Sequence, residues 1–324
     1  MAWDSVPWFI GGGAQHSPEV ARLLSFAATS GAQGIVSAPD LKVTPTAVPG
    51  GGVVVAPGAA LILNRATGGA SQTYVARLPI AETALVAPTS SAGRRSDLIV
   101  AQIEDPFMAG EPWQDPADPK VGPYIFTRVI PNVPAGTTRL QDVPGYAGRS
   151  AITLARVDLP ASTGTVTAAM ITDLRKLAQP RSARQVWSAG GHYQGGSDLT
   201  ATSGRQTWPN ATYTVDVPEW ATWVHVTLTL AGILQVGGQV DANLWLQFNN
   251  GDLGGSLKVD HDQIIDGVRN TYIITGSGTI APSNRGATRT VRLQGTTSSA
   301  RSGRLRSDAE AHILYDVQFE ERAV

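Results

Sequence analysis

The sequence predicts a mainly β protein with two antiparallel β-sandwich domains. Glycine and proline are abundant, at 35 Gly and 21 Pro in 324 residues, and long runs of helix-forming residues are few. Such a composition suits short strands joined by tight turns. Because the chain exceeds the usual size of one domain, we expect two domains, each able to bury its own core.

The first element that the sequence predicts is a short amphipathic helix starting at Ser17-Pro18-Glu19. Serine can cap the free N–H groups, proline fits the first helical position, and glutamate suits the positive end of a helix. Gly31 marks its end. The apolar residues fall on one face of this helix, namely Val20, Leu23, Leu24 and Ala27 or Ala28.

An apolar arm precedes the helix, and arm and helix together occupy residues 1–34. The arm carries Trp3, Trp8 and Phe9 before a run of three glycines. An arm this apolar needs a surface to bury against, in its own domain or in a neighbouring subunit. We take the three aromatic residues as assembly contacts.

Residues 35–178 form the first predicted β domain. Its Pro-rich excursion, 105–123, cannot be a central strand, so we expect a surface loop or an interface arm, with Trp113 as an assembly contact. A short helix is expected near 168–177, followed by a linker over 179–190. The strands are predicted over 53–56, 59–64, 73–78, 97–102, 124–130 and 150–158.

The second domain, residues 191–324, alternates apolar and polar residues with a period of two. This pattern predicts strands that each bury one face. We expect a jelly-roll-like or related antiparallel sandwich of about eight strands. Trp208 and Trp220 flank turn prolines and are expected to pack at edges. The apolar faces are Tyr213, Val215 and Val217; Val224, Val226, Leu228 and Leu230; Leu244, Leu246 and Phe248; and Ala311, Ile313, Tyr315, Val317 and Phe319.

Two tryptophans lie on the faces of these strands that should be wet. Trp223 shares its face with His225, and Trp245 shares its face with Gln247 and Asn249. An indole flanked by amides and hydroxyls is a common sugar-binding platform, because the ring stacks on C–H groups while polar neighbours fix the hydroxyls. Subunit packing, or cover from a loop, is the alternative reading of the same residues.

Charge and composition exclude several function classes. The formal net charge of −1 gives no basis for binding nucleic acid, and the absence of cysteine removes disulfides and thiolate chemistry. No stretch approaches a membrane span or a secretory signal, so we expect synthesis in the cytoplasm and no membrane insertion.

No catalytic or cofactor motif is visible, so we predict no enzyme, no cofactor and no metal site. The five histidines lack metal-site spacing. Residues 249–267 gather oxygen ligands of the kind that Ca²⁺ prefers, yet they match no known calcium loop. A solvated connection is expected there, and a bound cation stays open.

Three short strings carry a family resemblance. Arg95-Ser96-Asp97-Leu98-Ile99-Val100-Ala101 is followed by the Pro-rich excursion, then by Ala151-Ile152-Thr153-Leu154-Ala155-Arg156-Val157, and finally by Ile171-Thr172-Asp173-Leu174-Arg175. This order resembles bacteriophage minor tail and baseplate proteins of actinobacteriophage-like siphophages, over roughly residues 35–178. The strings are not a catalytic signature.

The resemblance implies a virion component of the tail tip or baseplate. The first domain would anchor to other tail proteins and the second would contact the host surface, with cell-wall glycan as the expected ligand. Relatives of this kind are commonly trimers. Arg95, Asp97, Asp173 and Arg175 match the family strings, and we expect them to form scaffold ion pairs. Two alternatives stay open, a purely structural tail protein and a polysaccharide depolymerase.

Overall fold

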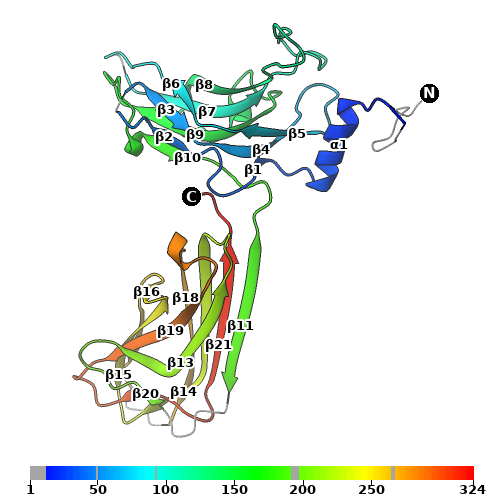
Figure 1. The fold of residues 1–324 in the computed structure, drawn as a ribbon. Helices are drawn as coiled ribbons and strands as arrows, with labels where there is room; N and C mark the ends of the chain where they lie inside the picture. The colour runs from blue at the N-terminus through cyan, green and yellow to red at the C-terminus, as the bar shows by residue number, and fades with distance from the viewer. Residues whose placement is uncertain (1–11, 49, 92, 191–196, 264–266) are drawn as a thin grey trace. The chain divides into compact units, whose positions relative to one another are not determined.

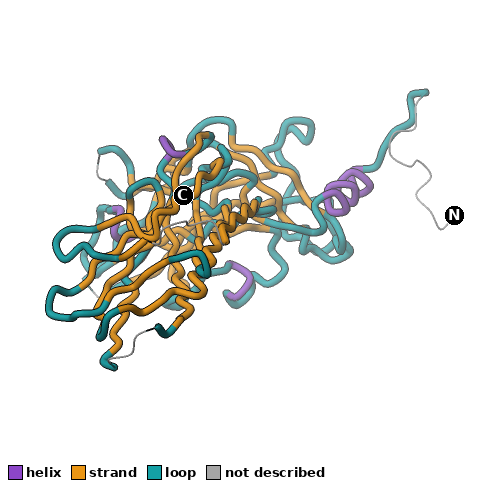
Figure 2. The backbone as a smooth tube through the Cα atoms, turned by 90° about the horizontal axis from the view of Figure 1, so that it is seen from below, coloured by secondary structure: helices purple, strands orange, loops and turns teal. Residues whose placement is uncertain are grey.

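The computed structural model describes the chain except residues 1–11, 49, 92, 191–196 and 264–266. The chain divides into two compact units, Met1–Gln179 with Ala323–Val324 (unit 1) and Pro180–Arg322 (unit 2). Strands dominate both, as Figures 1 and 2 show. The prediction of a mainly β, antiparallel fold with an N-terminal helix is confirmed.

Helix α1 (Pro18–Ala28) begins where the sequence predicts. The Ser17 hydroxyl accepts a hydrogen bond from the Val20 N–H at 3.2 Å, which caps the first turn. At the other end Gly31 has a φ of +68° and donates its N–H to the Phe26 carbonyl. Glycine adopts this left-handed conformation without steric cost, so the helix ends there.

Unit 1 holds three antiparallel sheets. Most of its buried apolar side chains form one cluster, to which strands of all three sheets contribute. The first sheet has the order β1 (Gly34–Ile35), β4 (Gly58–Leu63), β5 (Thr73–Leu78), and the second β2 (Val43–Pro45), β3 (Gly52–Val55), β6 (Glu82–Leu85). The third has the order β10 (Ile171–Asp173), β9 (Ala151–Leu159), β7 (Arg95–Ile103), β8 (Ile125–Val133).

Strand β7 is buried on both faces. Ile99 and Ala101 join the main cluster of unit 1, while Leu98 and Val100 join a smaller one on the other face. A short 3₁₀ turn, Leu140–Asp142, places Leu140 in that second cluster. The strand is therefore the centre of the unit, which explains its nearly continuous apolar sequence.

Two predictions near the boundary between the units are wrong. The helix expected over 168–177 is a single 3₁₀ turn, Ala168–Met170, followed by β10, because β-branched Ile171 and Thr172 pair with β9. The linker expected over 179–190 is a strand from Ser182 onward. This strand, β11 (Ser182–Gly190), pairs along its whole length with the last strand of unit 2.

Unit 2 contains two antiparallel sheets. The first has the order β11, β21 (His312–Glu320), β14 (Trp223–Val236), β18 (Arg269–Thr279). Two short strands extend it: β20 (Arg304–Ser307) pairs with the end of β14, and β12 (Ser197–Asp198) pairs with β20. The second has the order β13 (Gln206–Val217), β19 (Ala287–Thr297), β15 (Val240–Phe248), β17 (Leu257–His261), and β16 (Gly251–Asp252) also pairs with β15. A 3₁₀ turn, Pro282–Asn284, precedes β19.

The strand order is that of a jelly roll. Strand β11, the first long strand of unit 2, pairs with β21, the last. Along the chain the strands alternate between the sheets: β11, β14, β18 and β21 belong to the first sheet, while β13, then β15 with β17, and then β19 belong to the second. Eight strands in two four-stranded sheets connected this way define the jelly-roll topology. The predicted jelly-roll-like sandwich of about eight strands is thus confirmed.

Acid should weaken unit 2. Hydrogen bonds from arginines lower the pKa of Asp198 (from Arg306), Asp252 (from Arg205), Asp308 (from Arg269) and Asp316 (from Arg184). A carboxyl whose folded pKa lies below its unfolded value stabilises the fold above the unfolded pKa. That stability is lost as pH falls through the folded value, so the window lies below pH ~4.

We expect the melting temperature of unit 2 to fall as the pH drops from about 4 to about 2, measured by circular dichroism on the full chain. Asp198→Asn should reduce the pH dependence, because Asp198 alone holds both Arg304 and Arg306. A unit 2 melting temperature that stays constant across this range would contradict the expectation.

Candidate ligand-binding faces

The two tryptophans singled out in the sequence lie on different sheets. Trp223 is in β14 and Trp245 is in β15. Their strand neighbours Val224 and Leu244 both point into the core between the sheets. Because successive side chains of a strand alternate in direction, the two indoles lie on opposite outer faces of the jelly roll. The structure therefore separates them into two candidate sites.

The Trp245 face is a network of paired polar groups. The Arg205 guanidinium lies over the indole, 4.1 Å from the ring centroid, and its Nη1 is 2.8 Å from both carboxylate oxygens of Asp252. Gln247, only 5% exposed, donates its Nε2 to Asp252 at 2.8 Å and accepts from Arg292 Nε at 3.0 Å. These contacts fix each side chain, so the face is ordered without a ligand.

The network continues into the turn between β15 and β16. Asn249 and Asn250 have φ values of +44° and +70°, a conformation that asparagine tolerates better than most residues. Asn250 accepts a hydrogen bond from Arg292 at 2.8 Å, while Asn249 donates to Asn284 at 2.9 Å. Asn249 thus lies just past the end of β15, and Gln247 is closer than Asn249 to Trp245 in the sequence.

The sheet neighbours of Trp245 are also polar. Gln294 of β19 is its direct cross-strand partner, and Thr296 lies one outward position further along β19, opposite Asn243. Amides and hydroxyls that surround an indole match the pairing of stacking and hydrogen bonding that sugars require.

The Trp223 face has a different chemistry. Arg322 lies 4.2 Å from the centroid of the Trp223 ring and is held by Glu320 at 2.7 Å. His225 Nε2 lies 3.5 Å from the Thr227 hydroxyl, the limit of a hydrogen bond. Farther along the same sheet Ile273 is exposed. This face carries hydroxyls and, farther from the indole, an exposed apolar residue, and it differs from the amide network of the Trp245 face.

Arginine over an aromatic ring recurs through both units. Each arginine in these stacks also forms an ion pair with a carboxylate. A guanidinium on one ring face reduces the area left for a ligand and favours a packing role for the ring. The stacks are Arg22–Tyr74, Arg128–Phe126, Arg149–Trp113, Arg181–Trp220, Arg205–Trp245 and Arg322–Trp223.

The other predicted contact residues have different outcomes. Trp3, Trp8 and Phe9 lie outside the described residues. Trp113 packs beneath Arg149, and its buried indole N–H has no hydrogen-bond partner among the described residues. Edge packing for Trp208 is wrong, because Trp208 is fully buried in the jelly-roll core and donates its N–H to the Ser197 carbonyl at 2.7 Å.

The three family-like strings form adjacent strands of one sheet. They correspond to β7, β9 and β10, paired in the order β10, β9, β7. Buried Asp97 accepts two hydrogen bonds of 2.8 Å from Arg95, and Arg175 donates to Asp173 at 2.7 Å. The predicted scaffold ion pairs are confirmed for these residues.

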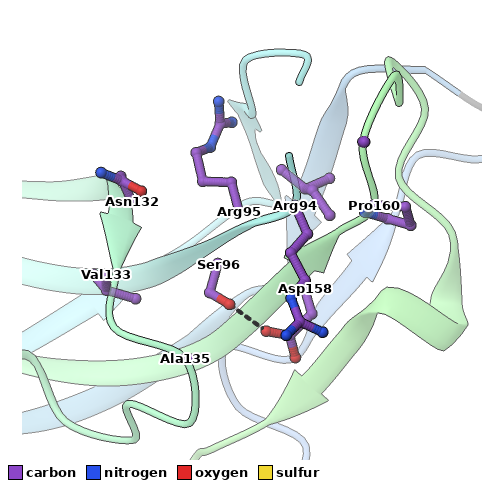
Figure 3. A pocket seen from close by; sticks show the side chains of 10 residues that line it. Arg94, Arg95, Ser96, Asn132, Val133, Ala135, Asp158 and Pro160 are labelled. Carbon is purple, nitrogen blue, oxygen red and sulfur yellow. Dashed lines mark hydrogen bonds between the residues drawn. The ribbon is translucent and has the colours of Figure 1, made fainter. Parts of the chain in front are cut away.

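A hollow of about 750 Å³ lies beside the start of β7. Figure 3 shows Ser96 of this strand hydrogen-bonded to Asp158 of β9, while the Arg95 side chain points away from Asp158. Ser96 donates to Asp158 at 2.7 Å, and Arg95 is engaged by Asp97. Since its polar groups are mostly satisfied by one another, we assign this hollow no ligand.

Two carboxylates of the oxygen-rich segment 249–267 form close ion pairs with arginines. Asp252 pairs with Arg205, and Asp262 pairs with Arg301 at 2.8 Å. Within the described part of the chain, no three histidine or acidic side chains are grouped to hold a metal ion. No described helix is long and apolar enough to span a membrane.

Comparison with known proteins gives no family. No family model and no curated protein matches the chain. The VP2 subviral particle of infectious bursal disease virus is 14% identical, with 95% of this chain and 83% of that chain covered and a TM-score of 0.27. The protein of T=1 particles derived from the same virus is 12% identical, with 95% of this chain and 81% of that chain covered and a TM-score of 0.27. An insecticidal delta-endotoxin of Bacillus thuringiensis is 10% identical, with 89% of this chain and 51% of that chain covered and a TM-score of 0.22. At TM-scores this low, no conclusion about function follows.

The sequence did not predict that Arg205, Asp252 and Arg292 lie at the Trp245 face. Arg205 lies in a loop, forty positions before Trp245, and no local sequence pattern connects the two. Only the pairing of β15 with β16 and β19 brings Asp252 and Arg292 to Gln247.

Proposed function

We propose that the chain is a non-enzymatic structural component of a phage virion, in the tail tip or baseplate. Unit 1 anchors it to other tail proteins, and unit 2 contacts the host surface. The anchoring role is supported by the three family-like strings, which are neighbouring strands with ion pairs that each have one buried member. The proposal includes assembly as a homotrimer, synthesis in the host cytoplasm, and no nucleic-acid partner.

The ligand that we propose for unit 2 is cell-wall glycan, bound at the Trp245 face. The observation that carries this proposal is the partly exposed indole beside fixed amides and guanidinium groups. A prearranged polar network lowers the entropic cost of binding, because its side chains are ordered before the sugar arrives. Arg205 covers part of the ring, which leaves the rest of the indole for stacking.

A purely structural role for unit 2 is the second candidate. It is favoured by the arginine stacks on both Trp223 and Trp245, which resemble the stacks elsewhere in the chain. In that case a protein neighbour in the tail would cover the Trp245 face. The two candidates differ in whether the free protein binds glycan.

Trp245→Ala should lower glycan affinity by about tenfold or more, the loss expected for a central aromatic contact. The full-length protein would be tested against purified bacterial cell-wall glycans by surface plasmon resonance. The matched control is Trp223→Ala, which removes an arginine-covered indole from the opposite face. Circular dichroism would verify that both variants are folded.

Equal loss in the two variants would contradict a site at Trp245. No binding by the folded parent to any wall glycan would favour the structural candidate.

A further inference from the structure

The arginines of unit 2 are mostly balanced by carboxylates. Within the described part of this unit, every arginine outside residues 285–292 forms an ion pair with an aspartate or a glutamate. The three arginines inside that segment donate only to carbonyl and amide oxygens of described residues. These three, Arg285, Arg289 and Arg292, therefore leave a local excess of positive charge, although the whole chain has a formal net charge of −1.

Arg292 carries this charge to the Trp245 face. The residues on either side of it in β19 point into the core, so Arg292 points to the same outer face as Trp245. Its cross-strand partner in β15 is Gln247, whereas Trp245 is paired with Gln294, two residues further along β19. Arg292 and Trp245 are thus diagonal neighbours in one sheet, ~7–8 Å apart between their Cα atoms. Long side chains at this separation can contact the same ligand.

The charge of Arg292 is not cancelled by the carboxylates of this face. Those on β15, β16 and β17 each have their own cation, in the pairs Asp241–Lys258, Asp252–Arg205 and Asp260–Arg301. On the other side, in β13, Asp216 lies opposite Thr288, four residues from Arg292 along β19. At ~3.3 Å per residue this is ~13 Å, which exceeds the Debye length of ~8 Å at physiological ionic strength. An anion on this face would therefore meet a cation that lacks a close counter-charge.

Arg292 also keeps donors for such an anion. Its Nε donates to Gln247 at 3.0 Å and its Nη2 to Asn250 at 2.8 Å, which fixes the guanidinium. Its Nη1 makes no hydrogen bond to a described residue, and a guanidinium donates from each of its nitrogens. Exposed Thr212 is the cross-strand neighbour of Arg292 in β13 and adds a hydroxyl. A fixed guanidinium beside a hydroxyl matches the oxygens of a carboxylate or phosphate group.

We propose that the glycan bound at the Trp245 face is anionic. Arg292 binds its carboxylate or phosphate oxygens, while Trp245 stacks on the sugar ring beside them. The inference rests on the proposed function, because it names the class of glycan that unit 2 takes. If Arg292 only positioned Gln247 and Asn250, the charge of the glycan would not affect its affinity.

Chemical removal of the acid groups tests the inference. Purified wall glycan would be compared by surface plasmon resonance with the same glycan after reduction of its carboxylates to alcohols, and after removal of its phosphate with hydrofluoric acid. We expect the full-length parent to bind the untreated glycan about tenfold or more tightly than the sample that lacks the recognised group, because a charge-assisted hydrogen bond is lost. The treatment that weakens binding identifies that group.

The same experiment separates this inference from the proposed function. Equal affinity for all three glycan samples, with binding still dependent on Trp245, would overturn the inference and leave glycan binding standing. No binding to any sample would overturn both.

Arg292→Gln replaces the cation with a neutral amide that can still donate to its neighbours. We expect it to lower the affinity for untreated glycan by about tenfold, to leave the affinity for the treated glycan unchanged, and to reduce the dependence of binding on NaCl concentration. Arg285→Gln is the matched control and should bind like the parent. It removes an arginine that also lacks a carboxylate partner among the described residues, but whose acceptor is the Ile280 carbonyl, just past the end of β18 in the other sheet.

Circular dichroism would verify that both variants are folded. Equal losses in the two variants would overturn the role of Arg292. So would an equal loss for untreated and treated glycan in Arg292→Gln, because that result is expected if Arg292 acts only by positioning Gln247.

Discussion

Arg175→Ala is expected to destabilise unit 1 by about 3–5 kcal/mol, because it removes a buried cation that holds several separate groups. Arg175 is 6% exposed and pairs with Asp173. It also donates to the carbonyls of Ala38, Asp40 and Val324 at 3.1, 2.7 and 2.7 Å. Without the guanidinium the Asp40 and Val324 carbonyls lose this donor, whereas the Ala38 carbonyl still accepts from the Val324 N–H at 3.3 Å. Buried polar groups that lose a partner are costly.

Urea unfolding of the full chain, followed by circular dichroism, would measure this loss. Arg94→Ala is the matched control, since Arg94 is exposed and should change the free energy of unfolding by less than about 0.5 kcal/mol. Arg175→Lys should recover only part of the loss, because an ammonium cannot reproduce the planar donor set of arginine. A loss below about 1 kcal/mol in Arg175→Ala would show that these carbonyls find other donors.

Trp208→Ala should destabilise unit 2 by about 3–5 kcal/mol. The side chain is among the largest that are fully buried, and its removal leaves a cavity between the two sheets of the jelly roll. Its N–H to Ser197 hydrogen bond is lost as well, which leaves a carbonyl acceptor without that donor.

Two further variants separate these contributions. Trp208→Phe keeps most of the volume and should cost less, with the lost hydrogen bond contributing about 1 kcal/mol. Trp220→Ala removes a partly exposed indole stacked on Arg181, so its effect on urea unfolding should be smaller than that of Trp208→Ala. Similar losses for Trp208→Ala and Trp220→Ala would contradict a special role for Trp208 in the core.

Strict alternation made the jelly-roll strands predictable from the sequence. In β14, Val224, Val226 and Leu228 point inward while hydroxyl residues point outward, and this pattern needs no tertiary information. Strand β11 escaped prediction because Arg184, Gln185 and Ser188 make it look like a polar connection. Its pairing with β21 and the stacking of Trp187 on Tyr213 define it as a strand.

The helix and the candidate sites show the limit of periodicity. The spacing of Val20, Leu23 and Leu24 predicted one apolar face correctly, yet spacing carries no information about which face packs on β5. Likewise the sequence grouped Trp223 with Trp245 because both lie on outward faces, although those faces belong to different sheets. The contacts of Arg205 with Trp245 and Asp252 depend on chain folding over distances that no local pattern records.

The hydrogen bond from Arg175 to Val324 has a practical consequence for dividing the chain. The two residues are separated by 149 positions, yet both belong to unit 1. Unit 1 is therefore not a contiguous stretch of sequence, and a fragment that ends at Gln179 lacks one of its own hydrogen-bond acceptors. Removal of the last two residues would likewise destabilise unit 1. Mapping of activities by truncation would then report a folding defect as a lost function, whereas point variants in the whole chain avoid this ambiguity.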